Sequence, residues 1–422
     1  MQNFNQFIKD FTKLIAINSE RTPAIKDMPF GEGVKKALDC FLEIAQSLGF
    51  NTINHQNYIG EISYGEGEEI GIIGHLDVVP ASNNWNTPPY TLTQIGNNFY
   101  GRGTSDDKGP TLICLYALKS VIDSGIKFNK KIRFFVGTNE ESGWEDIEYF
   151  KKNNHFPQFG FSPDGEFPVS YAEKGMYEVI FTLPSIKNFC DISGGSAINA
   201  VCDYASATPK FIPKQKDLEK FNLYIDNKKV CSKGVSAHGS TPHLGKNAIR
   251  NLFEYFVFCG EDLKNAIECF FNDKHGIFNL KNEQGEVTFS PNLISQNQKG
   301  EMVVSLDLRI PAPFTIEMVK EKLNQFGYAY KIIPHHPPMM ADSNGWFVKA
   351  LINAYNSTMQ QNLTPVSMGG STYARAFKMG CAFGGAFPND THVAHMPNEF
   401  ITKDSIFKQF EIYKKAIENL VK

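Results

Sequence analysis

An alternation of apolar strands with a helix limits the fold more than any other feature of this sequence. Residues 58–80 (YIGEISYGEGEEIGIIGHLDVVP) predict two short strands around a glycine-rich turn, and residues 131–138 (KIRFFVGT) predict another strand. Residues 111–125 (TLICLYALKSVIDSG), which lie between them, predict a helix. Uniformly apolar strands joined by a helix indicate a parallel α/β sheet that is covered on both faces. Because ligands bind at the carboxyl ends of such strands, we expect GHLD (74–77) and TNEES (138–142) on one rim.

The rest of the sequence indicates a second domain that is inserted into the first. From about residue 173 onward, alternating strand patterns predominate, with at least two helical patterns among them. Amphipathic helices are predicted again in the C-terminal part of the chain, as near the N-terminus. We therefore expect a discontinuous α/β domain of residues 1–172 and 340–422, into which an α+β domain of residues 173–339 is inserted.

Composition and charge exclude several classes of protein. A formal net charge of -3 and a pI of about 6.4 provide no broad basic surface, which excludes nucleic acid as a partner. The N-terminal stretch has apolar residues on one helix face rather than the unbroken core of a signal peptide, and no run of about 18 apolar residues occurs. The sequence therefore predicts a cytoplasmic protein without a membrane partner. The eight cysteines include no Cys-x-x-Cys pair, so we interpret them as reduced core residues rather than disulfides or a thiolate metal site.

Two polar residues, His75 and Asp77, end the strand pattern of GHLDVVP. Residues two apart in a strand point to the same face, so the Asp77 carboxylate would hold one imidazole nitrogen and leave the other for a metal. A lone His-x-Asp pair is more often a polar strand end, so this motif needs support from others.

Two adjacent acids, Asp106 and Asp107, follow in the glycine-rich segment GRGTSDDKGP. Glycines before a helix favour a phosphate site, but two carboxylates would repel an anion. The spacings of the known phosphate-binding loops are also missing. A cation fits this segment better than an anion.

Further candidates are Glu140 and Glu141 in TNEES, Asp164 in FSPDGEFP, and His392 and His395 in THVAHMPNEF. Each alone has an ordinary alternative, as a solvated turn acid or a histidine bonded to backbone. Together the motifs supply oxygen and imidazole ligands, a mixture that suits zinc, cobalt or manganese. Five such ligands exceed one tetrahedral site and match two metals that share a carboxylate.

The five motifs GHLDVVP, GRGTSDDKGP, TNEESG, FSPDGEFP and AHMPNEF resemble, in order and spacing, those of a family of di-zinc metallopeptidases. This family includes PepV-type dipeptidases, carnosinase, glutamate carboxypeptidase, aminoacylase and succinyl-diaminopimelate desuccinylase. The resemblance covers nearly the whole chain and is closest to the PepV-like branch. It implies a mostly parallel-sheet di-zinc catalytic domain flanked by helices, with the inserted α+β domain acting as a lid. It also implies a cis peptide bond between Asp106 and Asp107.

The resemblance implies a role for each motif residue. His75, Asp106 and Asp164 would hold one zinc, and Asp106, Glu141 and His395 would hold the other, with Asp106 as the bridge. Asp77 would orient His75, and Glu140 would be the general base and acid. His392, Asp107, Glu166 and Glu399 are assigned no direct chemistry.

Three substrate-binding residues are implied in the same way. His238 in KGVSAHGSTPHLGKNA would stabilise the oxyanion, although a surface-loop histidine is the alternative. Asn199 in GGSAINAV would approach the substrate carbonyl, with a plain turn residue as the alternative. Arg375 in MGGSTYARAF would clamp the terminal carboxylate of the substrate, since a guanidinium binds both oxygens at once.

The predicted function is zinc-dependent hydrolysis of amide bonds in dipeptides or short peptides with a free C-terminal carboxylate. A metal-bridged hydroxide would attack, with Glu140 as the base. Two Zn²⁺ per chain are expected, with Mn²⁺ or Co²⁺ as substitutes, and a monomer is favoured over a homodimer. One alternative is an N-acyl amino acid deacylase or desuccinylase with the same machinery. Another is a non-catalytic metal or peptide binder, which Glu140 disfavours because a binder needs no base.

Overall fold

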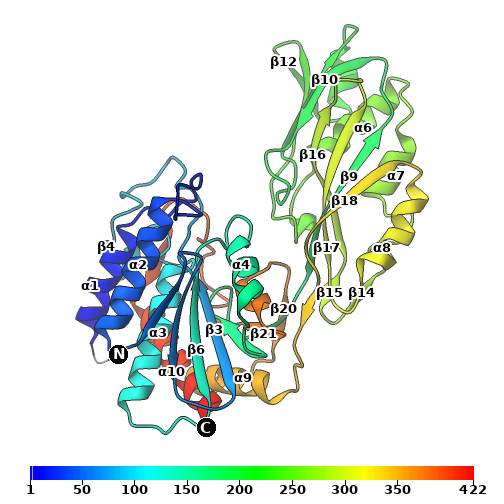
Figure 1. Cartoon of the computed structure of the whole chain (residues 1–422). Coiled ribbons are helices and arrows are strands. Elements are labelled where there is room, and N and C mark those ends of the chain that lie inside the picture. Colours follow the sequence, from blue (N-terminus) through cyan, green and yellow to red (C-terminus); the bar gives the residue numbers. More distant parts are fainter. Residues whose placement is uncertain (2) are drawn as a thin grey trace. The chain divides into compact units, whose positions relative to one another are not determined.

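The computed structural model describes residue 1 and residues 3–422, and the chain divides into two compact units. Unit 1 comprises Met1–Tyr171, Met340–Val366 and Thr372–Lys422, and unit 2 comprises Ala172–Met339 and Ser367–Ser371. The short segment Ser367–Ser371 belongs to unit 2 although unit 1 surrounds it in sequence. The Ser367 hydroxyl bonds this segment to the rest of unit 2, because it donates a hydrogen bond of 2.8 Å to the carbonyl of Gln284. Figure 1 shows both units, coloured along the sequence.

The central sheet of unit 1 is parallel in its middle and antiparallel at its edges. Seven of its nine strands are, in spatial order, β1 (Thr52–His55), β2 (Ile59–Tyr64), β6 (Lys131–Gly137), β3 (Glu69–His75), β7 (Phe159–Ser162), β21 (Met379–Ala382) and β8 (Ser170–Glu173). Strand β3 pairs in parallel with β6 and β7, and β7 pairs in parallel with β21. The pairs β1–β2, β2–β6 and β21–β8 are antiparallel. The predicted α/β class is therefore confirmed, and the parallel arrangement holds for the centre of the sheet.

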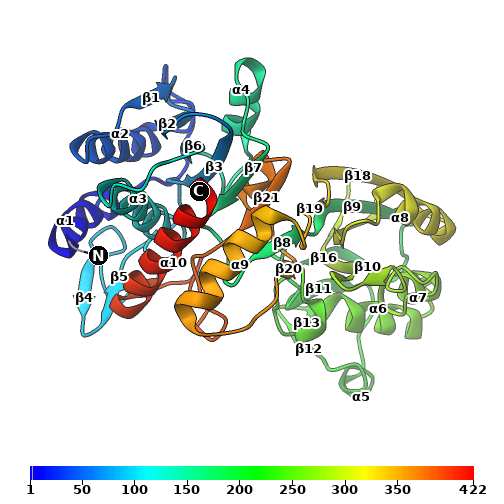
Figure 2. The ribbon, with the colours of Figure 1, turned by 90° about the horizontal axis from the view of Figure 1, so that it is seen from below.

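Six helices are described in unit 1: α1 (Phe4–Ile15), α2 (Glu32–Ser47), α3 (Lys108–Asp123), α4 (Glu145–Asn153), α9 (Trp346–Met359) and α10 (Lys403–Val421). Helix α1 buries Phe7, Phe11 and Leu14, the spacing that the sequence predicted for one apolar face. Helix α10 lies against both α3 and α9 (Figure 2). A small separate sheet contains β4 (Thr93–Ile95), β5 (Asn98–Tyr100) and β22 (Phe400–Thr402), and a 3-10 turn, η3, spans Tyr373–Ala376.

Unit 2 has an eight-stranded antiparallel sheet with helices, as the α+β prediction required. Its spatial order is β12 (Leu223–Asp226), β13 (Lys229–Lys233), β11 (Tyr204–Pro209), β10 (Phe189–Gly194), β16 (Thr288–Gln296), β17 (Met302–Ile310), β9 (Gly175–Leu183) and β18 (Ala329–His336). Side chains along β9 alternate between buried and half-buried, which is typical of a sheet with one face covered. The cover includes α6 (Ala248–Phe258), α7 (Lys264–Phe271) and α8 (Ile316–Leu323).

The remaining short elements are α5 (Gln215–Glu219), η1 (Pro242–Leu244), η2 (Asn324–Phe326), β14 (Lys281–Asn282), β15 (Gly285–Glu286), β19 (Met339–Met340) and β20 (Val366–Met368). All eight cysteines are free thiols. Five of them are buried, as the interpretation as core residues required, whereas Cys40, Cys190 and Cys259 are half-buried. Within the described part of the chain, no helix combines the length and the apolar character needed to cross a membrane.

Candidate metal centre

Three parallel strands of unit 1 end at one edge of the sheet. His75, the last residue of β3, pairs with Gly137, the last residue of β6, and the amide of Leu76 donates to the carbonyl of Gly137 at 3.1 Å. The segment TNEES follows β6 directly, and Asp164 follows the end of β7 by two residues. The prediction that GHLD and TNEES share a rim is therefore confirmed. We call these three strand ends the rim.

Five predicted site residues meet at the rim, with Asp106 in the middle. Asp106 Oδ1 lies 3.1 Å from Nε2 of His75, and Asp106 Oδ2 lies 3.0 Å from Nε2 of His395. Nε2 of His395 is also 3.1 Å from Glu141 Oε2, and Nε2 of His75 is 4.0 Å from Asp164 Oδ2. We call His75, Asp106, Glu141, Asp164 and His395 the five-residue cluster. The two carboxylate oxygens of Asp106 thus face two different histidines.

The donor atoms of this cluster fit a divalent metal. Atoms of His75, Asp106 and Glu141 all lie within 4.8 Å of one another, close enough to hold one ion. His75 Nδ1 donates to the backbone carbonyl of Asp77 at 3.0 Å, which fixes the imidazole and leaves Nε2 facing Asp106. Glu141 Oε1 is buried and has no hydrogen-bond partner among the described residues. Imidazole nitrogens with carboxylate oxygens are a ligand set that suits zinc and its neighbours.

Burial makes the ionised forms of most acidic residues at the rim less stable. Burial raises the pKa of Glu141 and, more strongly, that of Asp164, and the negative charge of Asp106 adds to both shifts. Burial also raises the pKa of Glu140 well above its usual range, and the neighbouring carboxylates add to this. Asp106 is the exception, because hydrogen bonds with His395 and His75 lower its pKa despite its burial. The acids therefore outnumber the nearby cationic groups, and a bound cation would relieve this imbalance.

Hydrogen bonds with Asp106 and Glu141 raise the pKa of His395 to about 11. His75 is buried, which by itself would lower its pKa, but hydrogen bonds with Asp106 and Asp77 raise it well above the usual value. The pKa values of both histidines are thus raised by the same surplus of negative charge.

Asp77 holds the turn that carries Glu140 and Glu141. Its two carboxylate oxygens accept hydrogen bonds from the backbone amides of Glu140 and Glu141, each at 3.0 Å. The Asp77 carboxylate also lies 3.6 Å from Nδ1 of His75, but the carbonyl of Asp77 takes the imidazole hydrogen bond. The predicted approach of the Asp77 carboxylate to His75 is therefore present, and its hydrogen bonds to the two amides are further contacts that the alternation rule did not predict. Strand β3 ends at His75, and this frees the Asp77 carboxylate to reach the turn.

Asp146, which the sequence analysis missed, holds the first half of the same turn. Its Oδ2 accepts from the amides of Thr138 at 2.7 Å and Asn139 at 3.1 Å, and from the hydroxyl of Tyr373. Asp146 and Tyr373 are fully buried. The carboxylates of Asp77 and Asp146 therefore accept hydrogen bonds from the four consecutive amides of residues 138–141. These bonds fix the backbone that carries the two glutamates of the turn. In the sequence, Asp146 looks like an ordinary acid in the first turn of α4, where acids stabilise helices in general.

Two further neighbours of the cluster have clear contacts. Asp107 is buried, and its Oδ2 accepts from the amide of His75 at 3.2 Å and from the Thr111 hydroxyl at 2.7 Å. The peptide bond between Asp106 and Asp107 is cis, as the resemblance implied. Glu399 is fully buried and accepts from the amide of Asp106 at 3.1 Å. Both acids act on the backbone around the cluster, whereas His392 is exposed.

In unit 2, the structure brings Asn199 and His238 together. The amide of Gly239 donates to the carbonyl of Asn199 at 2.7 Å, and Nδ1 of His238 lies 2.7 Å from the Ser240 hydroxyl. A Cβ atom on Gly239 would lie 2.1 Å from Oδ2 of Asp307, so a larger residue there would displace that carboxylate. Asp307 forms a buried ion pair of 2.7 Å with Arg309.

Arg375 lies in η3 of unit 1, two residues beyond Tyr373, and is half-buried. Since the Tyr373 hydroxyl bonds to Asp146 and accepts from the amide of Asn139, η3 is tied to the TNEES turn. Arg375 therefore belongs to the same short turn, η3, that contacts the TNEES segment through Tyr373.

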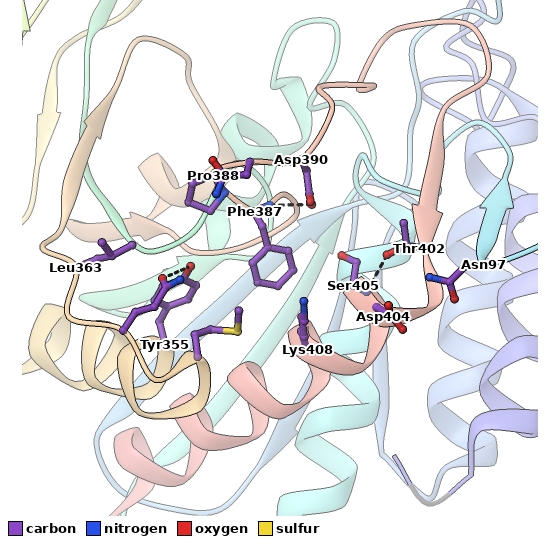
Figure 3. Close-up of a pocket in the computed structure, with 13 residues that line it drawn as sticks. Asn97, Tyr355, Leu363, Phe387, Pro388, Asp390, Thr402, Asp404, Ser405 and Lys408 are labelled. Carbon is purple, nitrogen blue, oxygen red and sulfur yellow. Dashed lines mark hydrogen bonds between the residues drawn. The ribbon is translucent and has the colours of Figure 1, made fainter.

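A cavity of about 530 Å³ lies elsewhere in unit 1, between α9, α10 and the loop at residues 387–390 (Figure 3). The ring of Phe387 projects into it, and Tyr355 and Lys408 approach from the two helices. Its lining contains no residue of the five-residue cluster and no histidine. The chemistry at the rim, rather than the size of this cavity, locates the candidate site.

Comparison with known proteins agrees with this location. A family model described as "Peptidase family M20/M25/M40" matches residues 71–419. A protein of Staphylococcus aureus (strain USA300) with the name "Putative dipeptidase" is 30% identical over 461 residues, which cover 99% of this chain and 97% of that protein.

Two solved structures are similar to the whole chain. An M20 family metallo-carboxypeptidase from Sulfolobus solfataricus has a TM-score of 0.61 and 16% identity, with 98% of each chain covered. A Bacillus subtilis protein described as a dinuclear metal binding peptidase from the M20 family has a TM-score of 0.54 and 10% identity, with 99% of each chain covered. At these identities the likeness establishes the fold.

Proposed function

The chain belongs to peptidase family M20/M25/M40, and from this premise we propose that it is a metal-dependent dipeptidase. It would hydrolyse dipeptides or short peptides that have a free C-terminal carboxylate. The observation that carries the proposal is the position of Asp106, whose two carboxylate oxygens face His75 and His395. A carboxylate placed in this way is suited to bridge two ions.

We assign the five-residue cluster to two divalent metals, with zinc as the native ion. His75, Asp106 and Asp164 would hold one ion, and Asp106, Glu141 and His395 would hold the other. The unpartnered Oε1 of Glu141 and the surplus of half-buried carboxylates support this assignment. The Bacillus subtilis protein is described as a dinuclear metal binding peptidase, which favours two ions rather than one. When bound, such ions polarise a peptide carbonyl and make water acidic near neutral pH.

Glu140 is proposed as the general base and acid. Its carboxylate accepts no hydrogen bond from any described residue, whereas its amide is fixed by Asp77 and its carbonyl by the indole of Trp144 at 2.9 Å. The backbone is therefore held while the side chain stays available. A carboxylate held in this way can take a proton from the attacking water and return it to the departing amine.

Arg375, His238 and Asn199 are proposed to bind the substrate. Arg375 would bind the C-terminal carboxylate through two of its guanidinium nitrogens. His238 and Asn199, which lie on paired backbone segments, would bind the carbonyl oxygen as charge develops on it. This arrangement would favour short substrates, because the carboxylate clamp recognises a chain end close to the scissile bond.

The test is a panel of dipeptides, N-acetyl amino acids and N-succinyl amino acids, assayed before and after chelation and after Zn²⁺, Mn²⁺ or Co²⁺ is restored. We expect cleavage of dipeptides that disappears on chelation and returns with metal. A dipeptide whose C-terminus is amidated serves as the matched control and should be cleaved poorly. Cleavage of acylated amino acids alone would overturn the dipeptidase proposal, and full activity after complete chelation would overturn the metal assignment.

A further inference from the structure

Glu399 is surrounded by hydrogen-bond donors from the loop that precedes Asp106. Its carboxylate is fully buried and accepts from the amides of Gly103 at 3.1 Å, Ser105 at 2.8 Å and Asp106 at 3.1 Å. Nη1 of Arg102 lies 2.7 Å from its other oxygen. Three backbone amides and one guanidinium thus converge on one carboxylate, which the proposed reaction does not use.

Glu399 also joins two segments that are far apart in the sequence. It directly precedes β22, which pairs with β5 so that Phe400 lies opposite Tyr100. The carbonyl of Glu399 accepts from the amide of Gly101 at 3.0 Å. From Gly101 the chain continues to Asp106. In the other segment, His395 precedes Glu399 by four residues. The position of Asp106 relative to His395 therefore depends on this junction.

We propose that Glu399 is a positioning residue that sets the direction of the Asp106 carboxylate, so that each of its oxygens faces a separate metal. The inference rests on the proposed metal function. A glutamine at position 399 has one acceptor oxygen in place of two, so the amides of residues 103, 105 and 106 and the Arg102 guanidinium could no longer all be satisfied, and Asp106 would lose its fixed orientation. The supporting residues of metal sites commonly change metal affinity by about 10-fold to 100-fold when they are altered.

Arg102 provides the matched control, because it contacts Glu399 but none of the five-residue cluster. It is itself buried, with its guanidinium 5.2 Å from the Trp85 ring centroid, Nη2 3.4 Å from the carbonyl of Pro80, and Nη1 3.4 Å from the carbonyl of Met396, the residue after His395. If Glu399 acts only by completing a buried ion pair, removal of either partner should have the same effect. If it acts through the amides of residues 103, 105 and 106, only its own substitution should disturb the metals.

The experiment is a titration of the metal-free full chain with Co²⁺, followed by visible absorption and by calorimetry, for wild type, E399Q and R102M. We expect wild type to bind two Co²⁺, and E399Q to bind them about 10-fold to 100-fold more weakly with a shifted absorption band, since that band reports ligand geometry. R102M should retain the wild-type band and affinity, although it unfolds at a lower temperature. E399D, which keeps the charge on a shorter side chain, should fall between wild type and E399Q, and it replaces E399Q if that variant does not fold.

Equal weakening in E399Q and R102M, or no weakening in either, would overturn the positioning role while leaving the metal function intact. A wild-type chain that binds no Co²⁺ would overturn the metal function and this inference together. The two failures are therefore distinguishable in the same titration.

Discussion

The sheet of unit 1 supports two groups of acidic residues whose surroundings differ. Glu61 of β2 and Glu69 of β3 lie on either side of Arg133 of β6, with Arg133 Nε 2.7 Å from Glu61 Oε1 and Arg133 Nη1 3.1 Å from Glu69 Oε2. At the rim, by contrast, Glu140, Glu141 and Asp164 have no arginine or lysine as an ion-pair partner among the described residues. The first group has a cation that belongs to the protein, and the second has an excess of carboxylate.

The pKa values show the consequence of this difference. Burial tends to raise the pKa of Glu61, but hydrogen bonds from His55 and Arg133 outweigh it and lower the pKa to about 2. Burial raises the pKa of Glu141, and the hydrogen bond with His395 does not offset it. Carboxylates whose charge is balanced by an arginine of the same protein are a structural feature. Carboxylates whose charge the protein does not balance are a candidate metal site.

The largest expected effect follows from Asp106→Asn, which removes the charge shared by both proposed ions. We expect activity to fall at least about a thousandfold, because a metal contributes several kcal/mol to such a reaction and each 1.4 kcal/mol is about tenfold. Thermal unfolding with and without Zn²⁺ checks the cause. Metal at about 100 times its Kd should stabilise wild type by about 2.7 kcal/mol, and the variant should gain little. A variant that is stabilised as strongly as wild type would contradict the bridging role.

Glu140→Gln should separate catalysis from metal binding. We expect the turnover number to fall by about 10²-fold to 10⁴-fold, the usual contribution of a general base, while two metals per chain are retained. Steady-state kinetics combined with metal analysis of the same sample makes the measurement. If the variant loses a metal, Glu140 is a ligand; if it keeps full turnover, another group is the base.

The rim was predictable because each of its motifs begins where an apolar run ends. The runs before His75, Glu140 and Asp164 mark strands, and the parallel arrangement then places their ends together. Strand pairing was less predictable: β2 and β3 are neighbours in the sequence, but β6 lies between them. Which strands pair depends on long-range packing, and a local apolar pattern carries no information about it.

The residues that orient the site could not be read from the sequence, because they act on backbone amides. Asp146 accepts from Thr138 and Asn139, and every residue type except proline offers such an amide, so no side-chain pattern marks the contact. Glu399 reaches amides almost 300 positions earlier in the chain, which only the pairing of β22 with β5 makes possible. The resemblance could give roles to ligands, but these supports became visible only in the folded chain.

Arg133→Met tests the other side of the comparison. The variant leaves Glu61 and Glu69 without their shared cation, so we expect the free energy of unfolding to fall by about 2 to 4 kcal/mol. Urea unfolding of the metal-free protein measures this, and a separate sample loaded with metal should bind as much metal as wild type. The double variant Arg133→Met with Glu61→Gln should recover part of the loss, because the partly buried charge is then removed. A simple sum of the two single effects would mean that the pair is not coupled.

The smallest expected effect is the pH dependence of Glu61→Gln. The pKa of Glu61 is about 2 in the folded chain, below its ordinary value of 4.5, so its ionised form stabilises the fold. This contribution is complete above pH 4.5 and is lost as the pH falls through 2. After allowance for solvent screening we expect a wild-type advantage of about 1 to 2 kcal/mol at pH 7.

Urea midpoints of the two proteins, measured between pH 7 and pH 2 in the presence of a chelator, follow this difference. The gap between wild type and Glu61→Gln should be constant down to about pH 5 and then narrow toward pH 2, since protonated Glu61 resembles glutamine in charge. Because the chelator removes metal from both proteins, titration of the rim affects them equally and cancels in the comparison. A gap that widens with acid would show that Glu61 is destabilised by ionisation, as the rim acids are, and would remove the contrast between the two groups.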